Sequence, residues 1–211
     1  MNKDNIDIKS LTKEEQKELI KTYAEGSKTL ELALRTLWNK KLYTTACCKG
    51  HLLGEKHFYF TSMYSYIAFE KGIDVFKYLS DDLINNPYIV LTSDSNQAIF
   101  FYGENKDSLM LMFITDIMKK KEVNSRFLEG KVNKLLDPIT KEQVKHDYYL
   151  KSGFTEKEYQ EIRETEDDIL ILRMKSQYNN IDENESEELF DKCIKIKNDV
   201  YQRKLKKNRG R

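Results

Sequence analysis

The sequence predicts an α+β fold: a two-layer, mainly antiparallel sheet with helices in the N-terminal part, followed by a C-terminal α-helical hairpin. Between residues 43 and 102, short aromatic and β-branched runs are separated by turn-forming residues, as in antiparallel strands. After residue 150, apolar residues recur at helical spacing within highly charged sequence, which is typical of two paired helices. We therefore expect an α/β two-layer domain over residues 1–121, a linker over 122–150 and a helical hairpin with a basic tail over 151–211.

Two helices are expected before the first strand. Thr12 and Glu15 form a capping box, so the first helix begins after Thr12 and ends near Tyr23. Ser27 caps a second helix that has one apolar stripe. The stripe consists of Leu30, Ala33, Leu34, Leu37 and Trp38. We expect Trp38 to anchor the core where this helix meets the first strand.

Strand-like runs follow at residues 43–47, 58–60, 64–70, 88–92 and 98–102. The last two are joined by Ser93-Asp94-Ser95-Asn96, a composition typical of a hairpin loop. A helix is expected over residues 73–85, with Val75, Phe76, Leu79 and Leu83 on one stripe. Another begins at Asp107 or Ser108 and is apolar almost all round, so we expect it to be buried against the sheet.

The hairpin has clear helix signals. Thr155 and Glu158 form a second capping box, and Phe154 and Tyr159 are placed as its hydrophobic staple. After the polar break at residues 179–180, another helix has an apolar seam of four residues. They are Leu189, Cys193, Ile196 and Val200.

Composition limits the compartment and the class of partner. No run approaches the roughly 20 apolar residues of a membrane span, and the first residues are not an apolar signal region. We therefore expect a cytoplasmic protein with no membrane partner. Three cysteines, two of them adjacent, do not make a disulfide framework, so reduced thiols are expected. The 36 basic and 35 acidic residues nearly cancel, and the net charge thus argues neither for nor against nucleic acid.

Reactive side chains are densest around residues 44–57. They are Cys47, Cys48, His51 and His57. Thiolate and imidazole are zinc ligands, which makes a metal site one interpretation. Adjacent strand residues point to opposite faces, however, and only His146 and Cys193 remain to supply a second ligand pair. We expect structural packing with a turn at Gly50 and no cofactor, and keep zinc as the alternative.

The same residues allow a thiol enzyme. Cys48 or Cys47 would attack the substrate, and His51 or His57 would be the base that forms the thiolate. No acid or amide is recognisably placed to orient the histidine, and buried cysteine is often a small hydrophobe. We lean towards a protein that is not an enzyme, with a thiol- or zinc-dependent enzyme as the alternative.

The last nine residues are strongly basic. The cations are Arg203, Lys204, Lys206, Lys207, Arg209 and Arg211. Basic tails neutralise phosphates, so these are the candidate partner-binding residues and a route to nucleic acid. The simpler interpretation is that they complement the helix dipole and solubilise a frayed end.

The run Leu37-Trp38-x4-Tyr43-Thr44-Thr45-Ala46-Cys47-Cys48-x-Gly50-His51 resembles a motif of small uncharacterised proteins of gut Firmicutes, their phages and mobile elements. Such elements carry anti-CRISPR and other anti-defence inhibitors. The resemblance covers part of the first half and contributes no catalytic residue. It implies an intracellular inhibitor or adaptor that engages a protein or nucleoprotein complex, such as a bacterial defence nuclease.

Overall fold

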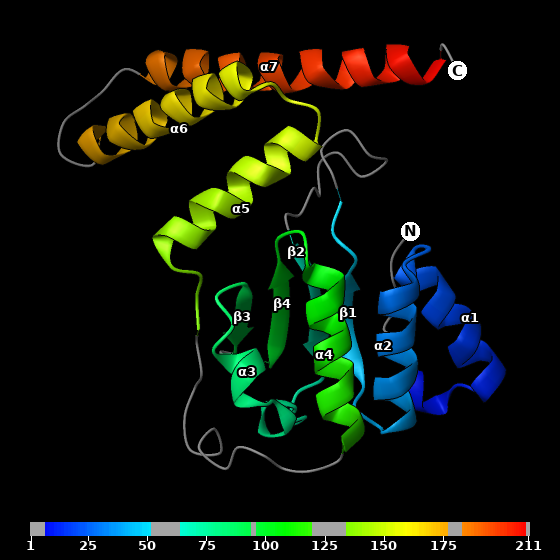
Figure 1. The fold of residues 1–211 in the computed structure, drawn as a ribbon. Helices are drawn as coiled ribbons and strands as arrows, with labels where there is room; N and C mark the ends of the chain where they lie inside the picture. The colour runs from blue at the N-terminus through cyan, green and yellow to red at the C-terminus, as the bar shows by residue number, and fades with distance from the viewer. Residues whose placement is uncertain (1–6, 52–63, 94–95, 120–133, 177–182, 210–211) are drawn as a thin grey trace. The chain divides into compact units, whose positions relative to one another are not determined.

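The structure is a computed structural model that describes residues 7–51, 64–93, 96–119, 134–176 and 183–209; for 169–176, 183–187, 190 and 208–209 only the backbone is described. The chain divides into two compact units (Figure 1). We call Met1–Gly50 with Ser62–Val144 the sheet unit, and His51–Thr61 with Lys145–Arg211 the helical unit. None of the described helices is both long and apolar enough to cross a membrane.

The sheet unit begins with a short 3-10 helix at Ile8–Ser10, then α1 (Lys13–Ala24) and α2 (Lys28–Asn39). The predicted capping box is confirmed: Thr12 N donates to Glu15 Oε2 at 2.7 Å, and Glu15 N donates to Thr12 Oγ1 at 3.2 Å. Ser27 Oγ accepts from Leu30 N at 3.2 Å, which caps α2. The predicted stripe of α2, including Trp38, is fully buried.

Four antiparallel strands form one sheet in the order β1-β2-β4-β3. They are β1 (Thr44–Cys48), β2 (Tyr64–Phe69), β3 (Ile89–Thr92) and β4 (Ala98–Tyr102). The antiparallel α+β prediction is therefore confirmed. The predicted strand at residues 58–60 lies outside the described residues.

The prediction of one continuous helix over residues 73–85 is wrong, but the four apolar side chains predicted on its stripe are buried. A 3-10 turn (Phe76–Tyr78) and the four-residue α3 (Asp81–Ile84) replace it. Side chains distant in sequence accept its amide protons: Gln97 Oε1 accepts from Val75 N at 2.7 Å and from Phe76 N at 3.2 Å, and Asp116 Oδ2 accepts from Ser80 N at 2.8 Å. In a continuous helix the amide of Ser80 would donate to the carbonyl of Phe76; it bonds to Asp116 instead, and the helix is interrupted there.

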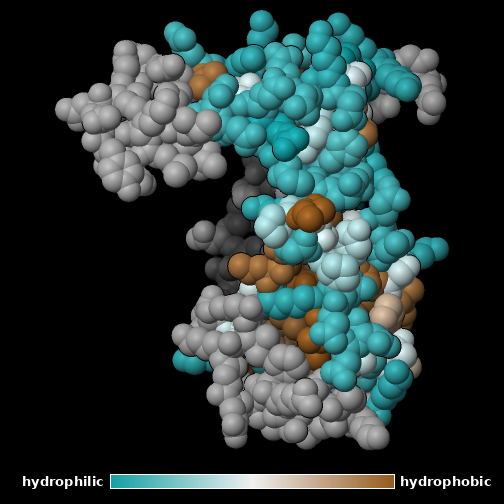
Figure 2. Space-filling model, turned by 60° about the vertical axis from the view of Figure 1, so that its left-hand side comes forward, coloured by the Kyte–Doolittle hydropathy of each residue, from teal (hydrophilic) through white to brown (hydrophobic). Residues whose placement is uncertain are grey.

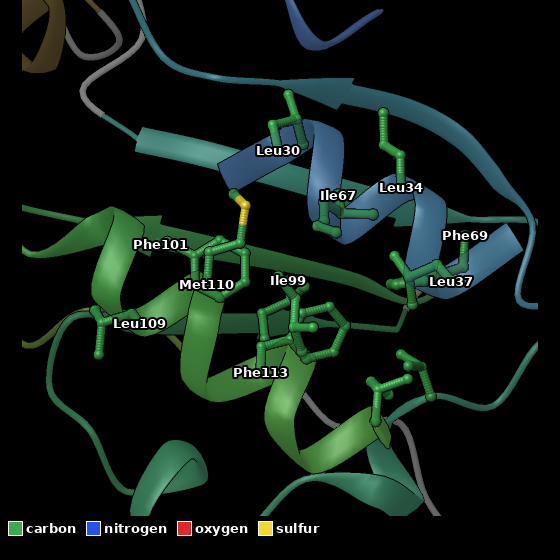
Figure 3. Packing of buried hydrophobic residues seen from close by; sticks show 14 of the residues in the cluster. Leu30, Leu34, Leu37, Ile67, Phe69, Ile99, Phe101, Leu109, Met110 and Phe113 are labelled. Atoms are coloured by element: carbon green, nitrogen blue, oxygen red, sulfur yellow. The ribbon is translucent and has the colours of Figure 1, made fainter. Parts of the chain in front are cut away.

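The main core lies between one face of the sheet and helices α2 and α4 (Lys106–Lys119). Figure 3 shows side chains of both helices pointing towards those of β2 and β4. The labelled residues are Leu30, Leu34, Leu37, Ile67, Phe69, Ile99, Phe101, Leu109, Met110 and Phe113. All are buried, so α4 packs against the sheet as predicted.

Helices α6 (Glu156–Ser176) and α7 (Glu183–Arg209) form the predicted hairpin (Figure 1). The predicted linker contains a further helix, α5 (Pro138–Lys151), whose last turns belong to the helical unit. Gly153 ends α5 with φ +92°, and Phe154 N donates to Tyr149 O at 3.2 Å. The rings of Tyr149 and Phe154 then pack 5.0 Å apart, starting the small core of this unit.

Candidate functional site

Cys47 and Cys48 lie on opposite faces of the sheet. Cys47 pairs with Ile67 and packs against the main core, whereas Cys48 pairs with Tyr66 on the other face. The expectation that adjacent thiols diverge is therefore confirmed. Both are free cysteines, half-buried.

The segment after β1 is fixed by a tight turn. Gly50 has φ +78°, and its amide donates to Cys48 Sγ at 3.3 Å. The carbonyl of Lys49 accepts from Ser65 Oγ at 2.6 Å and from Lys106 Nζ at 2.9 Å. A Cβ added at Gly50 would lie 2.8 Å from Tyr64 O, so this turn requires glycine.

The candidate histidines belong to the other unit. All three histidines of the chain, at positions 51, 57 and 146, fall in the helical unit, and His57 lies outside the described residues. His51 is buried, and its carbonyl accepts from Tyr148 Oη at 3.2 Å. Among the described residues, no group of three or more His, Cys, Asp or Glu is placed to hold a metal.

The other two proposed zinc ligands, Cys193 and His146, make contacts within the helical unit. Cys193 is buried in the core of the helical unit, where burial raises the pKa of its thiol. His146 Nε2 lies 2.9 Å from Glu156 Oε2, and this carboxylate raises the pKa of the imidazole. Its ring also packs edge-on to Tyr159, with centroids 4.9 Å apart. His146 therefore joins α5 to the start of α6.

The basic tail begins with a structural ion pair. Arg203 makes a two-pronged contact with Glu158, at 2.8 Å through Nη1 and 2.9 Å through Nη2. Glu158 also accepts from Thr155 N at 2.8 Å, which confirms the second capping box. Arg203, followed by these hydrogen bonds, lowers the pKa of Glu158 to about 2. Lys204 packs over Gly153, Lys206 and Lys207 are exposed, and the side chains of Arg209 and Arg211 lie outside the description.

The second face of the sheet carries aromatic rings. Along β2, Ser65, Ile67 and Phe69 are buried towards the helices, while Tyr64 and Tyr66 point the other way and are half-buried. Tyr102 is the register partner of Tyr64, and Phe100 that of Tyr66. We call Tyr64, Tyr66, Tyr88, Phe100 and Tyr102 the aromatic platform.

The rings of the aromatic platform touch one another. Tyr64 lies 5.0 Å from Tyr102 between centroids, and Tyr66 stacks on Phe100 at 5.5 Å. Tyr88, directly before β3, extends the row, because Tyr102 N donates to Tyr88 O at 2.9 Å. It is 38% exposed and lies against Gly103, where a Cβ would be 3.3 Å from its ring. Burial, then Tyr64, raises the pKa of Tyr102 to about 12, so its hydroxyl stays protonated.

The outward side of α4 is apolar. Leu111 is 44% exposed, Met112 40% and Met118 60%, although the opposite side of the same helix is buried. Leu111, Thr115 and Met118 follow i, i+4, i+7 spacing and lie along one line on the helix. We call Leu111, Met112, Thr115 and Met118 the α4 outer face. The sequence signal for it was the all-round apolar pattern, which was interpreted only as burial.

A groove of about 350 Å³ lies near the end of the same helix, and is lined by Asn39, Lys40, Leu42, Tyr78 and Ile117. None of these residues was a predicted site. Between two of the lining residues, Lys40 and Leu42, Lys41 adopts φ +60°.

No protein-family model, no curated protein and no solved structure matches this chain.

Proposed function

We propose that this protein acts by binding a protein partner through the α4 outer face. The observation that carries the proposal is the exposure of Leu111, Met112 and Met118 on a helix whose opposite side is buried. Neighbouring exposed apolar side chains mark interaction surfaces, and methionine adapts to a partner's shape. Figure 2 shows brown, hydrophobic side chains on the sheet unit, whereas the surface of the helical unit is mostly teal.

The specific form of the proposal is inhibition of a bacterial defence nuclease, alone or in complex with nucleic acid. It is motivated by the resemblance of residues 37–51 to proteins of phages and mobile elements. An inhibitor that blocks by occupancy acts stoichiometrically. We therefore expect inhibition to saturate at one chain per nuclease complex.

The test is a titration of the full chain into a panel of purified defence nucleases, with DNA cleavage as the readout. For an inhibited nuclease, Leu111→Ser combined with Met118→Ser should weaken binding about tenfold or more, as interface anchors do. Leu135→Ser combined with Ile139→Ser is the matched control, since both residues are exposed and lie off α4. Inhibition at far below one chain per complex, or equal loss in the control, would contradict the proposal.

The enzyme alternative has its own readout. Cys48→Ser and His57→Ala should leave stoichiometric inhibition unchanged if the protein only binds. If either abolishes the effect, or if elemental analysis finds one zinc per chain and a chelator lowers the melting temperature, a thiol- or zinc-dependent enzyme is the better conclusion.

A further inference from the structure

The middle of the α4 outer face can be covered without leaving its hydroxyl group unsatisfied. Leu111, Met112 and Met118 are exposed hydrophobic side chains. Thr115 lies among them, and its hydroxyl already donates to Leu111 O at 2.8 Å within the helix. A hydroxyl that is bonded in this way can be buried by a partner without losing a hydrogen bond. This part of α4 is therefore suited to a dry protein contact.

The two ends of α4 carry opposite charges on the exposed side. At the start, Glu104 and Asp107 are exposed, whereas Lys106 is half-buried and its Nζ donates to Lys49 O at 2.9 Å. At the end, the side chain of Lys119 is 62% exposed, and its Nζ lies 3.4 Å from a carboxylate of the same helix. The exposed side is thus acidic at the start, apolar in the middle and basic at the end.

We infer that the α4 outer face pairs with the same face of a second copy of this chain, with the two helices antiparallel. Homodimers with a two-fold axis are the commonest oligomers, and in them one patch contacts itself. In the antiparallel direction, Lys119 of each copy lies over the first turn of α4 in the other copy, where Asp107 is exposed. In the parallel direction like charges would meet and repel. The order of charges along α4 therefore fits a second copy, and in one direction.

The spacing of the apolar residues defines which side chains meet. Leu111 and Met118 mark the two ends of the apolar part, so in an antiparallel pair each packs against the other residue of the second copy. Thr115 then lies close to the two-fold axis, beside Thr115 of the other copy. Its small side chain allows the helix axes to approach to about 8–10 Å, the usual packing distance. The flexible methionine side chains fill the space on either side.

Pairing of two copies would regulate the site proposed above. This step rests on the proposed function, because it takes the α4 outer face to be the surface that a target binds. A dimer covers Leu111, Met112 and Met118 in both copies, so a target must compete with the second copy. The apparent affinity for the target then falls in proportion to the fraction of chain that is monomeric. The dimer is the storage form, and the monomer is the form that binds.

The first test is analytical ultracentrifugation of the full chain over a range of concentrations. A reversible equilibrium between monomer and dimer is expected. Leu111→Ser combined with Met118→Ser should raise the dissociation constant of the dimer about tenfold or more, as loss of interface anchors does. Leu135→Ser combined with Ile139→Ser is the matched control and should leave this constant unchanged, since both residues are exposed and lie off α4.

Exchange of charges tests the antiparallel direction. Asp107→Lys and Lys119→Asp should each raise the dissociation constant of the dimer about threefold or more, because each dimer then contains two like-charged contacts. An equimolar mixture of these two variants should associate as tightly as the unaltered chain, because every acid again meets a lysine. A chain that carries both substitutions should also recover. Circular dichroism checks the folding of each variant.

A cysteine crosslink tests the position of the two-fold axis. Under mild oxidation, Thr115→Cys should give a disulfide-linked dimer on a non-reducing gel. Ser108→Cys is the matched control, since it is exposed on the same helix. In the antiparallel pair the two copies of residue 108 lie about 20 Å apart along the axis, at 1.5 Å per residue, which a disulfide does not span. The unaltered chain gives the background from its own three cysteines.

Three outcomes would overturn the inference. They are a chain that stays monomeric at every concentration, charge variants whose mixture associates no better than either alone, and crosslinking of Ser108→Cys as readily as of Thr115→Cys. Nuclease titration separates this inference from the proposed function: Lys119→Asp should inhibit at least as strongly as the unaltered chain, because more of it is monomeric. A monomeric chain that inhibits a nuclease refutes the pairing alone. A dimer that dissociates on Leu111→Ser with Met118→Ser, without inhibition of any nuclease, refutes the proposed function and leaves the pairing standing.

Discussion

The sheet unit and the helical unit are stabilised in different ways. The sheet unit has one broad apolar cluster shared by α1, α2, α4 and the four strands. Among the described side chains of the helical unit, the buried cluster has six members, and charged contacts surround it. Glu166 pairs with Lys145 at 2.5 Å and with Lys197 at 3.6 Å, and Arg203 pairs with Glu158. Packing should therefore determine stability in the first unit, while pH and salt should affect mainly the second.

The largest effect is expected from the core of the sheet unit. Trp38→Ala should lower the free energy of unfolding by about 3–5 kcal/mol, as other aromatic truncations in cores do. The side chain is only 3% exposed, and its Nε1 donates to Thr44 Oγ1 at 3.1 Å. Urea denaturation followed by circular dichroism measures the change. Trp38→Phe keeps a ring but loses the hydrogen bond, so it should lower the free energy of unfolding by less than Trp38→Ala does. A loss below about 1 kcal/mol for Trp38→Ala would contradict the explanation by core packing.

A smaller loss is expected at the turn after β1. Gly50→Ala should cost about 2–3 kcal/mol, because the left-handed backbone is strained for alanine and the new Cβ would press on Tyr64 O. Gly72→Ala is the matched control: Gly72 has φ +86°, but no atom lies within 4 Å of its Cβ position. The control should cost about 1 kcal/mol, from backbone strain alone. Equal losses would mean that the close approach to β2 contributes nothing.

The smallest effect should depend on pH and belong to the helical unit. The pKa of Glu158 is lowered to about 2 from its usual 4.5, so its ion pair stabilises the fold above about pH 4.5 and is lost as pH falls towards 2. Glu158→Gln should cost about 1–2 kcal/mol at pH 7, after allowance for solvent screening, and almost nothing near pH 2. A double-mutant cycle with Arg203→Gln isolates the pair. A penalty that stays constant with pH would show that the cap, not the charge, matters.

The local features of the fold could be predicted from the sequence. Both capping boxes, the stripe of α2 and the burial of Trp38 were predicted because they depend on residues within a few positions of one another. The start of α5 had the same kind of signal: Thr140 N donates to Asp137 Oδ1 at 3.0 Å, and Pro138 occupies the first helical position. The charged sequence around it, with little amphipathic pattern, led to the interpretation as a linker.

Features set by distant residues could not be predicted in this way. The amide of Ser80 bonds to Asp116, far away in the sequence, and this bond interrupts the expected helix. The alternation in β2 indicated two faces, but only the sheet order and the positions of α2 and α4 decide which face is covered. The candidate site shared this limit: the exposure of Leu111, Met112 and Met118 depends on which side of α4 the sheet covers, and the all-round apolar pattern of the helix does not encode that side.

Trp38 also gives the protein a built-in optical reporter. It is the only tryptophan of the chain and is enclosed in the core of the sheet unit, where Tyr23 packs edge-on to its ring with centroids 6.5 Å apart. Emission excited at the red edge of the tryptophan band therefore comes from one unit alone. If the helical unit melts first, circular dichroism should change while this emission stays constant, so the two signals together would resolve the units without any label.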